Sequence, residues 1–168
     1  MKKKIEALSV IMSVKNGEKF LHKAIDSILN QTFKNFEFII INNDSSDSTQ
    51  EILENFIKKD SRIKILKNFN NETLYQARIK VIKEAKYEWC ALMDADDECH
   101  PQRFQKQVDF INNTEFENLA VVSTYGKYIN KNSTIVANFF SGPKDINQFK
   151  NIFSNNDSFA IIDPSSII

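Results

Sequence analysis

Four acidic residues fall within five consecutive positions, at Asp94, Asp96, Asp97 and Glu98. They follow the apolar run WCALM directly, so we expect a buried strand to fix the first of them in place. Like charges this close repel one another unless a positive partner offsets the repulsion. Mg²⁺ and Mn²⁺ prefer oxygen ligands and commonly take one or two carboxylates together with substrate phosphate oxygens. The cluster is therefore typical of a hard-cation site.

Asp94 and Asp96 stand two positions apart, which leaves two arrangements open. Either both contribute to the metal site, or one binds the ion while the other accepts a hydrogen bond from a ligand hydroxyl. For these two residues we favour function over a plain turn. Asp97 and Glu98 have a second interpretation, as favourable charges ahead of a helix that begins at Pro101, and for Glu98 we prefer it.

Arg78 falls inside the apolar stripe of a helix expected over residues 72–85. The stripe is defined by helical spacing: Leu74, Ala77, Val81, Ile82 and Ala85. A guanidinium there must reach solvent or find anions. Two interpretations weigh about equally. One is a structural ion pair with a strand-end acid, and the other is a contact to an anionic ligand such as phosphate, which the forked geometry of arginine suits.

Alternating strands and helices position these residues. Short apolar runs predict strands covered on both faces at residues 8–14, 36–41, 63–66 and 89–93. Helices are expected at residues 21–29, after a capping box at 48–51, over 72–85 and from Pro101 onward. This alternation predicts a parallel sheet with right-handed crossovers. Ligands of such sheets bind outside the carboxyl ends of the strands, so the polar segments that follow three of these strands should converge on one crevice.

The pattern changes after residue 118. Residues 119–124 and 135–139 predict strands, and the sequence NKNS at residues 130–133 between them is turn-like. We expect a single domain over residues 1–168, with a ligand-binding half at 1–112 and the start of a further part at 113–168. The apolar end FAIIDPSSII favours a chain cut short, with a terminal strand of the sheet as the alternative.

Composition excludes several classes of protein. Twenty-two basic and 22 acidic residues leave no net charge, which argues against a general binder of nucleic acid or of membrane surfaces. The start MKKKIEALSV lacks the apolar segment of a signal peptide, and no apolar run approaches a membrane span. Two unpatterned cysteines fit a reducing cytoplasm. We expect Cys90 to be buried and Cys99 to be an incidental loop thiol.

Missing glycines exclude three kinds of phosphate-binding enzyme. The chain has three glycines, at Gly17, Gly126 and Gly142. No G-x-G-x-x-G follows the first strand, and no G-x-x-x-x-G-K-[ST] exists. Dinucleotide-binding Rossmann enzymes and P-loop proteins therefore do not fit, nor do sugar-1-phosphate nucleotidyltransferases, which need a glycine-rich loop after the first strand.

Five segments together resemble family 2 glycosyltransferases of the GT-A fold. They are SVIMSVKNGE from Ser9, AIDSILNQTFKNFEF from Ala24, INNDSSDST from Ile41, NNETLYQAR up to Arg78, and LMDADD from Leu92. In order and spacing the resemblance covers residues 8–112. It implies an α/β fold with a mainly parallel, Rossmann-like sheet flanked by helices, here with an additional β segment after residue 118. It also implies an enzyme that transfers a sugar from a nucleotide diphosphate.

The resemblance implies which residues bind the nucleotide. Ser13, Val14 and Lys15 would line the base, and Asn16 beside them would also bind the nucleotide sugar. Asn43 stands where the family usually has an aspartate that reads the base. An amide can accept a hydrogen bond from the N3–H of uracil, so UDP is our best candidate. Because an amide can also donate a hydrogen bond, the identity of the base stays open.

Arg78 matches the family's arginine near the donor nucleotide. Asp94 would hold the ribose or the donor sugar, with Ala95 beside it. Asp96 would ligate the Mn²⁺ or Mg²⁺ ion that bridges the diphosphate, and Asp94 is the second candidate ligand. The ion would neutralise charge on the departing nucleoside diphosphate.

The family's catalytic base is an Asp or Glu that deprotonates the acceptor hydroxyl for attack with inversion. We expect it beyond Ile168, since Glu115 and Glu117 lie too early and Asp163 is at most a weak candidate. The implied partners are a nucleotide-sugar donor and a glycan or lipid-linked acceptor of bacterial cell-envelope polysaccharide biosynthesis, without nucleic acid. We expect a cytoplasmic location, or one at the inner face of the cytoplasmic membrane through a part beyond residue 168. The alternative function is a non-catalytic nucleotide-sugar-binding module of the same fold.

Overall fold

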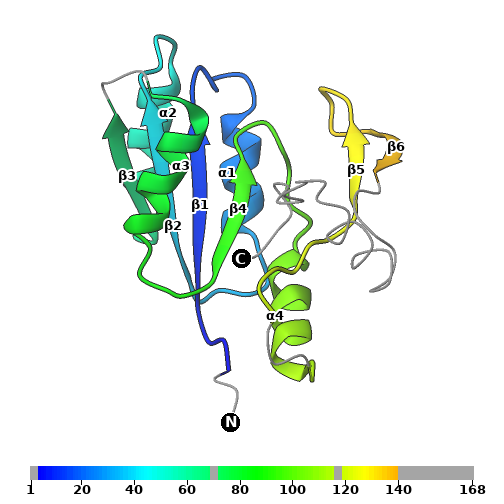
Figure 1. Cartoon of the computed structure of the whole chain (residues 1–168). Coiled ribbons are helices and arrows are strands. Elements are labelled where there is room, and N and C mark those ends of the chain that lie inside the picture. Colours follow the sequence, from blue (N-terminus) through cyan, green and yellow to red (C-terminus); the bar gives the residue numbers. More distant parts are fainter. Residues whose placement is uncertain (1–3, 69–71, 116–118, 140–168) are drawn as a thin grey trace, which may run out of the picture.

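The computed structural model describes residues 4–68, 72–115 and 119–139. Its centre is a four-stranded sheet in the order β3-β2-β1-β4, whose neighbours are all parallel, and a hairpin of β5 and β6 lies apart from it (Figure 1). The elements are β1 (Leu8–Val14), α1 (Leu21–Leu29), β2 (Phe36–Asn43), α2 (Thr49–Ile57), β3 (Ile63–Asn68), α3 (Leu74–Lys83), β4 (Cys90–Asp94), α4 (Arg103–Asn113), β5 (Gly126–Ile129) and β6 (Ile135–Phe139). The predicted α/β class, the parallel sheet and the β segment after residue 118 are confirmed.

Some expectations fall outside these ranges. The apolar end FAIIDPSSII lies outside the described residues, as do Asp163 and Glu117. The division of the chain near residue 112 stays a prediction. Within the described ranges, no helix has the length and apolar character that crossing a membrane requires.

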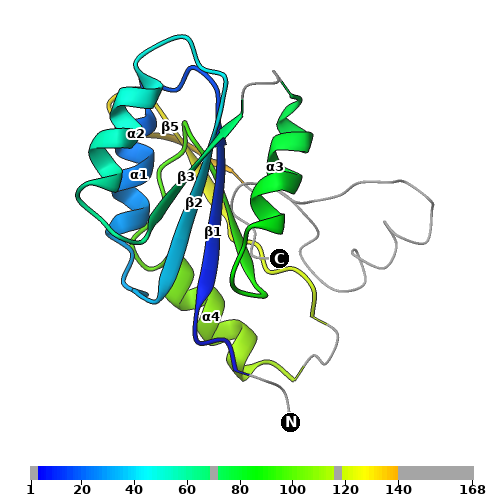
Figure 2. The same ribbon diagram turned by 90° about the vertical axis from the view of Figure 1, so that its left-hand side faces the viewer.

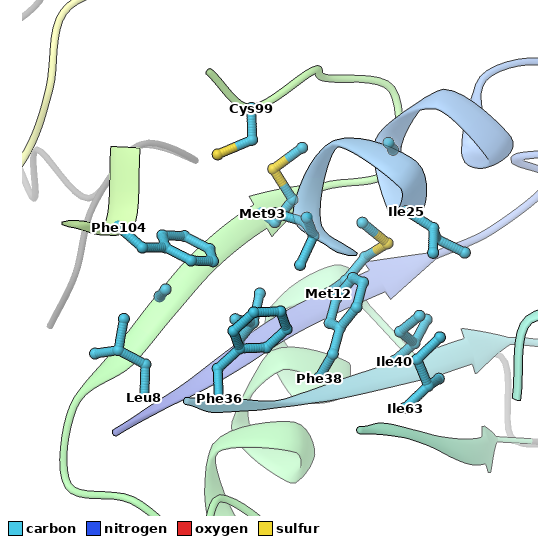
Figure 3. Close-up of a cluster of buried hydrophobic side chains, with 14 of the residues drawn as sticks. Leu8, Met12, Ile25, Phe36, Phe38, Ile40, Ile63, Met93, Cys99 and Phe104 are labelled. Atoms are coloured by element: carbon cyan, nitrogen blue, oxygen red, sulfur yellow. The ribbon is translucent and has the colours of Figure 1, made fainter. Parts of the chain in front are cut away.

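The helices cover the two faces of the sheet unequally. Figure 2 shows α1 and α2 on one face and α3 on the other. The core on the α1 and α2 side is the larger and also takes in α4 (Figure 3). Alternate strand residues such as Met12, Phe38 and Met93 belong to it, whereas the intervening Ile11 and Ile39 meet α3. Because both faces are apolar, these strands are continuous apolar runs in the sequence.

α3 covers its face with a narrower stripe than the sequence predicts. Ala77 and Val81 are buried, but Leu74 is 52% exposed and Ile82 is 40% exposed. The prediction that Leu74 and Ile82 line the core is therefore wrong. Leu74 is the first residue of the helix, and Ile82 lies roughly 100° around the helix from Val81, away from the sheet.

The helix starts also differ from the predictions. Ser48 makes no side-chain capping hydrogen bond, because its backbone lies near the helical region instead of the extended region that a capping serine adopts. Asp47 Oδ1 accepts the N–H of Thr49 instead, at 3.0 Å. α4 begins at Arg103, after a turn at Pro101. The capping box that the structure does contain lies at α3, where Thr73 and Gln76 satisfy each other's backbone N–H groups.

The strand expected at residues 119–124 does not form, apart from a single bridge at Val122. Gln107 Nε2 of α4 donates to the carbonyl of Val122 at 2.9 Å, so this segment is held along the helix. β5 begins only at Gly126 and pairs with β6, which confirms the predicted strand at residues 135–139 and the turn before it. Asn130 and Thr134 close that turn with a backbone hydrogen bond of 3.0 Å.

Gly17, in the loop after β1, has no room for a side chain. A Cβ added there would lie 2.5 Å from Val14 Cγ2. Val14 is buried and β-branched, so its side chain cannot turn aside. Gly17→Ala should therefore lower the free energy of unfolding by about 1–3 kcal/mol, measured by chemical denaturation. In a Val14→Ala background the same change should cost less, and an equal cost in both backgrounds would show that the clash is not the cause.

Candidate functional site

Strand register brings the polar residues of three strand ends together. Ser13 of β1 pairs with Asp94 of β4, and Val14 pairs with Asn42 of β2. Asn43 is the last residue of β2, one step beyond that pair. Ser13 and Asn43 are buried, while Asp94 is about one-third exposed. The carboxyl ends of β1, β2 and β4 therefore form one edge, at the top of Figure 1.

The loop after β1 and the loop after β2 begin at this edge and are joined to each other by hydrogen bonds. The N–H of Asn16 donates to Ser45 Oγ at 2.9 Å, and the N–H of Gly17 donates to Thr49 Oγ1 at 2.8 Å. Asn16 Oδ1 in turn accepts the N–H of Ser46 at 2.9 Å. The backbone of Asn16 is left-handed, at φ 53°, a conformation that asparagine tolerates because its side chain bonds locally. The loop after β1, which holds Lys15 and Asn16, is thus fixed relative to the loop after β2.

Asp47 connects the same two loops. Its Oδ2 accepts the N–H of Glu18 at 3.0 Å and its Oδ1 accepts the N–H of Thr49. Glu18 returns the contact by accepting the N–H of Ser48 at 3.0 Å. Partial desolvation acts to raise the pKa of Asp47, but the hydrogen bonds from Thr49 and Glu18 outweigh it and leave that pKa below the ordinary value for aspartate.

The two asparagines at the end of β2 have different partners. Asn42 Nδ2 donates to Gln50 Oε1 at 2.9 Å, and Asn42 Oδ1 accepts the N–H of Ser45 at 3.2 Å. Asn43 Nδ2 donates to the backbone carbonyl of Glu72 at 2.7 Å. Asn42 therefore organises its own loop, whereas Asn43 links β2 to the segment that leads into α3.

Arg78 of α3 forms an ion pair with Asp94, donating from Nη2 to Oδ1. Both side chains are about one-third exposed. Of the two interpretations of Arg78, the structural pair with a strand-end acid is thus present in the molecule. The pair also gives Asp94 a positive partner within the acidic cluster. A contact from Arg78 to a bound anion stays a prediction.

The rest of the acidic cluster lies in an open turn. Asp96, Asp97 and Glu98 are exposed, and the N–H of Asp97 points to the carbonyl of Asp94 at 3.4 Å. Across residues 4–68, 72–115 and 119–139, no three His, Cys, Asp or Glu side chains are grouped closely enough to hold a metal ion. The donor set of Asp94 and Asp96 fits an ion that takes one or two carboxylates and completes its shell with substrate oxygens and water. Ala95 packs against the larger core.

A buried polar network under the acidic turn was not predicted from the sequence. Arg103 is 7% exposed and donates from Nη2 to the carbonyl of Leu92 at 2.9 Å and from Nε to Gln107 Oε1 at 3.1 Å. Its guanidinium also lies 3.7 Å from Cys99 Sγ. Arg103 and Gln107 stand four apart in a helix whose apolar residues face the core, and that spacing was the available signal.

Cys99 is buried in this network, so its interpretation as an incidental loop thiol is wrong, while the expected burial of Cys90 is confirmed. The N–H of Cys99 donates to Ser27 Oγ at 2.9 Å, which fixes the residue against α1. Burial raises the pKa of both thiols.

Glu98 has a tertiary role that its sequence position does not reveal. Its Oε1 accepts a hydrogen bond from Ser133 Oγ, in the turn between β5 and β6. Lys23 of α1 lies 3.8 Å from the same carboxylate and donates to Ser133 Oγ at 2.9 Å and to the carbonyl of Lys131 at 3.2 Å. The hairpin turn is thus attached both to α1 and to the acidic turn. No signal within the local sequence predicts such a contact across 35 residues.

The chain is similar to known proteins along most of its length. A model described as Glycosyl transferase family 2 matches residues 9–167. An uncharacterized glycosyltransferase of Methanocaldococcus jannaschii is 35% identical over 134 residues, which are 79% of this chain and 46% of that protein. WfaP of Escherichia coli, a UDP-Glc:alpha-D-GlcNAc-diphosphoundecaprenol beta-1,3-glucosyltransferase, is 31% identical over 143 residues, which are 85% of this chain and 54% of WfaP.

Solved structures are similar as well. The crystal structure of S. aureus TarS in complex with UDP matches with a TM-score of 0.57 and 25% identity, over 62% of this chain and 31% of that one. TarS has also been solved with UDP-GlcNAc. The chain thus spans about half the length of the curated relatives that it matches.

The contacts of Asp47 generate a prediction about pH. Asp47→Asn should lower stability at neutral pH, because the amide offers one acceptor oxygen to two N–H donors. The folded-state pKa of Asp47 is lowered, so its stabilisation is present above the unfolded pKa of about 3.9 and is lost as the pH falls through the folded pKa. The difference in free energy of unfolding between wild type and variant should therefore shrink from about pH 7 to about pH 3.

Urea unfolding at several pH values measures that difference. Asp44→Asn is the matched control, since it removes the same charge from an exposed position of the same loop. A difference for Asp47→Asn that stays constant over this pH range would contradict the proposed hydrogen-bonding role.

Proposed function

The chain belongs to glycosyl transferase family 2, and we propose that it binds a nucleotide diphosphate sugar, with a UDP-sugar as the best candidate. The binding site is the edge formed by the carboxyl ends of β1, β2 and β4. The observation that carries the proposal is the register that sets Ser13 beside Asp94, with Asn43 at the end of the next strand. Parallel α/β sheets bind ligands at such an edge. TarS, a structural relative with the same GT-A fold, has been solved with UDP and with UDP-GlcNAc.

The base binds on the side of β1 and β2 in this proposal. Ser13, Val14, Lys15 and Asn16 line the base, and the hydrogen bonds between the two loops keep this lining in place before a ligand arrives. Because these loops are already fixed, less conformational entropy is lost when the nucleotide binds. Asn43 presents its side chain at the end of β2, which supports a role near the base.

The diphosphate binds on the side of β4. Arg78 supplies a positive charge there and Asp94 a hydrogen-bond acceptor for a ribose or sugar hydroxyl. The Arg78–Asp94 ion pair supports this division, because it holds both side chains at the end of β4. A bound nucleotide then competes with or extends this contact.

Asp96 holds a Mn²⁺ or Mg²⁺ ion in this proposal, with Asp94 as the second candidate. The exposed carboxylate of Asp96 supports that assignment, since the ion needs room for phosphate oxygens and water. When bound, such an ion neutralises charge on the departing nucleoside diphosphate. The carboxylates of the turn repel a diphosphate otherwise, so the proposal makes donor binding dependent on the metal.

The whole protein transfers the sugar to a glycan or lipid-linked acceptor, with inversion at the anomeric carbon. A carboxylate removes the proton of the acceptor hydroxyl, the oxygen forms the new bond to the anomeric carbon, and the nucleoside diphosphate leaves with the electron pair of the old bond. The lipid-linked acceptor in the name of WfaP supports this acceptor class. We further propose a role in cell-envelope polysaccharide synthesis, in the cytoplasm or at the inner face of the cytoplasmic membrane. The catalytic base of this chain is unassigned.

UDP should stabilise the 168-residue chain only when a divalent cation is present. At a UDP concentration about 100-fold above Kd the gain is about 2.7 kcal/mol. For a domain of this size that corresponds to a rise in Tm of roughly 5–10 °C. Thermal unfolding with UDP, with and without Mn²⁺, measures it. Equal stabilisation in EDTA would overturn the metal-dependent part of the proposal, and no stabilisation under any condition would overturn UDP as the nucleotide.

Asp96→Ala should remove the Mn²⁺-dependent part of UDP binding, whereas Asp97→Ala should leave most of it. The two variants lose the same charge from adjacent exposed positions, so they are matched in their general electrostatic effect. We expect a loss of affinity of at least about tenfold for Asp96→Ala, or about 1.4 kcal/mol. Isothermal titration calorimetry measures both, and the reverse ranking would place the metal on Asp97.

A further inference from the structure

α3 is attached to the sheet by few apolar side chains. Within the helix only Ala77 and Val81 are buried, and Leu74, Tyr75 and Ile82 are all at least 40% exposed. The smaller core on this face is otherwise built from strand residues such as Ile39 and Leu92. Buried apolar area is the main attraction between a helix and a sheet, so a short stripe leaves the polar contacts of α3 with more influence on its position.

Two of those polar contacts join α3 to the strand ends of the candidate site. At the start of the helix, Asn43 Nδ2 donates to the carbonyl of Glu72 at 2.7 Å. In the helix itself, Arg78 donates to Asp94. Asn43 is 4% exposed and sits at the end of a strand buried on both faces, so its side chain is a fixed point. Glu72 and Arg78 are six residues apart, and the Thr73–Gln76 capping box stiffens the chain between them.

The chemistry of this contact requires an amide. A backbone carbonyl only accepts hydrogen bonds, so the group of Asn43 that faces Glu72 must be the NH₂. An ionised aspartate has no donor, and in its place a carboxylate oxygen would face the carbonyl oxygen. The loss of this hydrogen bond and the repulsion between the two oxygens would both displace Glu72.

We propose that Asn43 is a positioning residue, whose amide holds the start of α3 against the end of β2 and thereby places Arg78 at the end of β4. The placement of α3 is a property of the unliganded chain. Its consequence for nucleotide affinity rests on the proposed function. The amide at position 43 is then a requirement of this chain's own structure, and an aspartate there disorders the start of α3.

Hydrogen exchange of the unliganded chain tests the placement of α3. In Asn43→Asp, the backbone amides of residues 76–78 should exchange about tenfold faster than in the wild type, because the helix start that protects them opens more often. Asn42→Asp is the matched control, with the same substitution one residue earlier and also at a buried position.

Asn42→Asp can keep both of its contacts. Gln50 can turn its amide to donate to the new carboxylate, at the cost of its exposed contact to Glu54, and that carboxylate still accepts from Ser45. Exchange at residues 76–78 should therefore stay within about twofold of the wild type in this control. If Asn43→Asp leaves exchange at α3 unchanged, or if both variants accelerate it equally, the proposal is overturned.

A double-mutant cycle with Arg78→Met tests whether Asn43 acts through Arg78. UDP affinity in the presence of Mn²⁺ should fall about tenfold for Asn43→Asp in the wild type but less than about threefold in the Arg78→Met background. Equal losses in the two backgrounds would overturn the link to Arg78. A wild-type chain that does not bind UDP would instead contradict the proposed function, and the exchange experiment would still decide the role of Asn43.

Discussion

Parallel pairing of β1 with strands on both of its sides is the constraint on which the rest of this structure depends. β1 is buried along its whole length, and its alternate residues enter the cores on the two faces of the sheet. Because a shift of one residue would exchange those faces, the register with β2 and β4 is strongly specified. That register sets Ser13 beside Asp94 and Val14 beside Asn42. The polar edge of the molecule thus follows from the packing of its apolar strands.

The sequence was sufficient where the signal is local. The strands were predictable because both faces are covered, which gives short continuous runs such as LSVIMSV, and the polar segments at their ends marked the site edge. Periodicity also located α3, but it could not show that Leu74 and Ile82 stay exposed. Burial of a helix residue depends on how far the sheet extends beneath it, and that is a property of the assembled fold.

Contacts between distant segments account for what the sequence could not supply. Three hydrogen bonds illustrate this, each made by a polar side chain whose partner is fixed only by tertiary structure. They join the Gly17 N–H to Thr49, Arg103 to the carbonyl of Leu92, and Ser133 to Glu98. Arg78 illustrates the limit best. Its place in an apolar stripe indicated that the guanidinium needs an anionic partner. Only the structure shows that this partner is Asp94.

The two sides of the site edge are held in different ways. The loops after β1 and β2 are joined by a set of direct hydrogen bonds around Asn16 and Asp47. The end of β4 is instead joined to α3 through Arg78 and to the hairpin through Glu98. Both sets of contacts lie at exposed or half-exposed positions, and ion pairs at such positions contribute little to stability and are screened by salt. In the proposed function, the metal and the diphosphate bind at the β4 side.

In the proposed function, three strand ends form one site for a nucleotide and its metal. Mn²⁺ is paramagnetic and broadens the NMR signals of nearby amides, so a titration of the ¹⁵N-labelled chain with Mn²⁺ and saturating UDP tests it directly. The amides of residues 14–17, 43–45 and 94–97 should broaden together at the lowest Mn²⁺ additions, while those at the opposite end of the sheet, such as Leu8 and Phe36, keep their intensity. Broadening confined to residues 94–97, with the other two segments unaffected, would contradict a shared site.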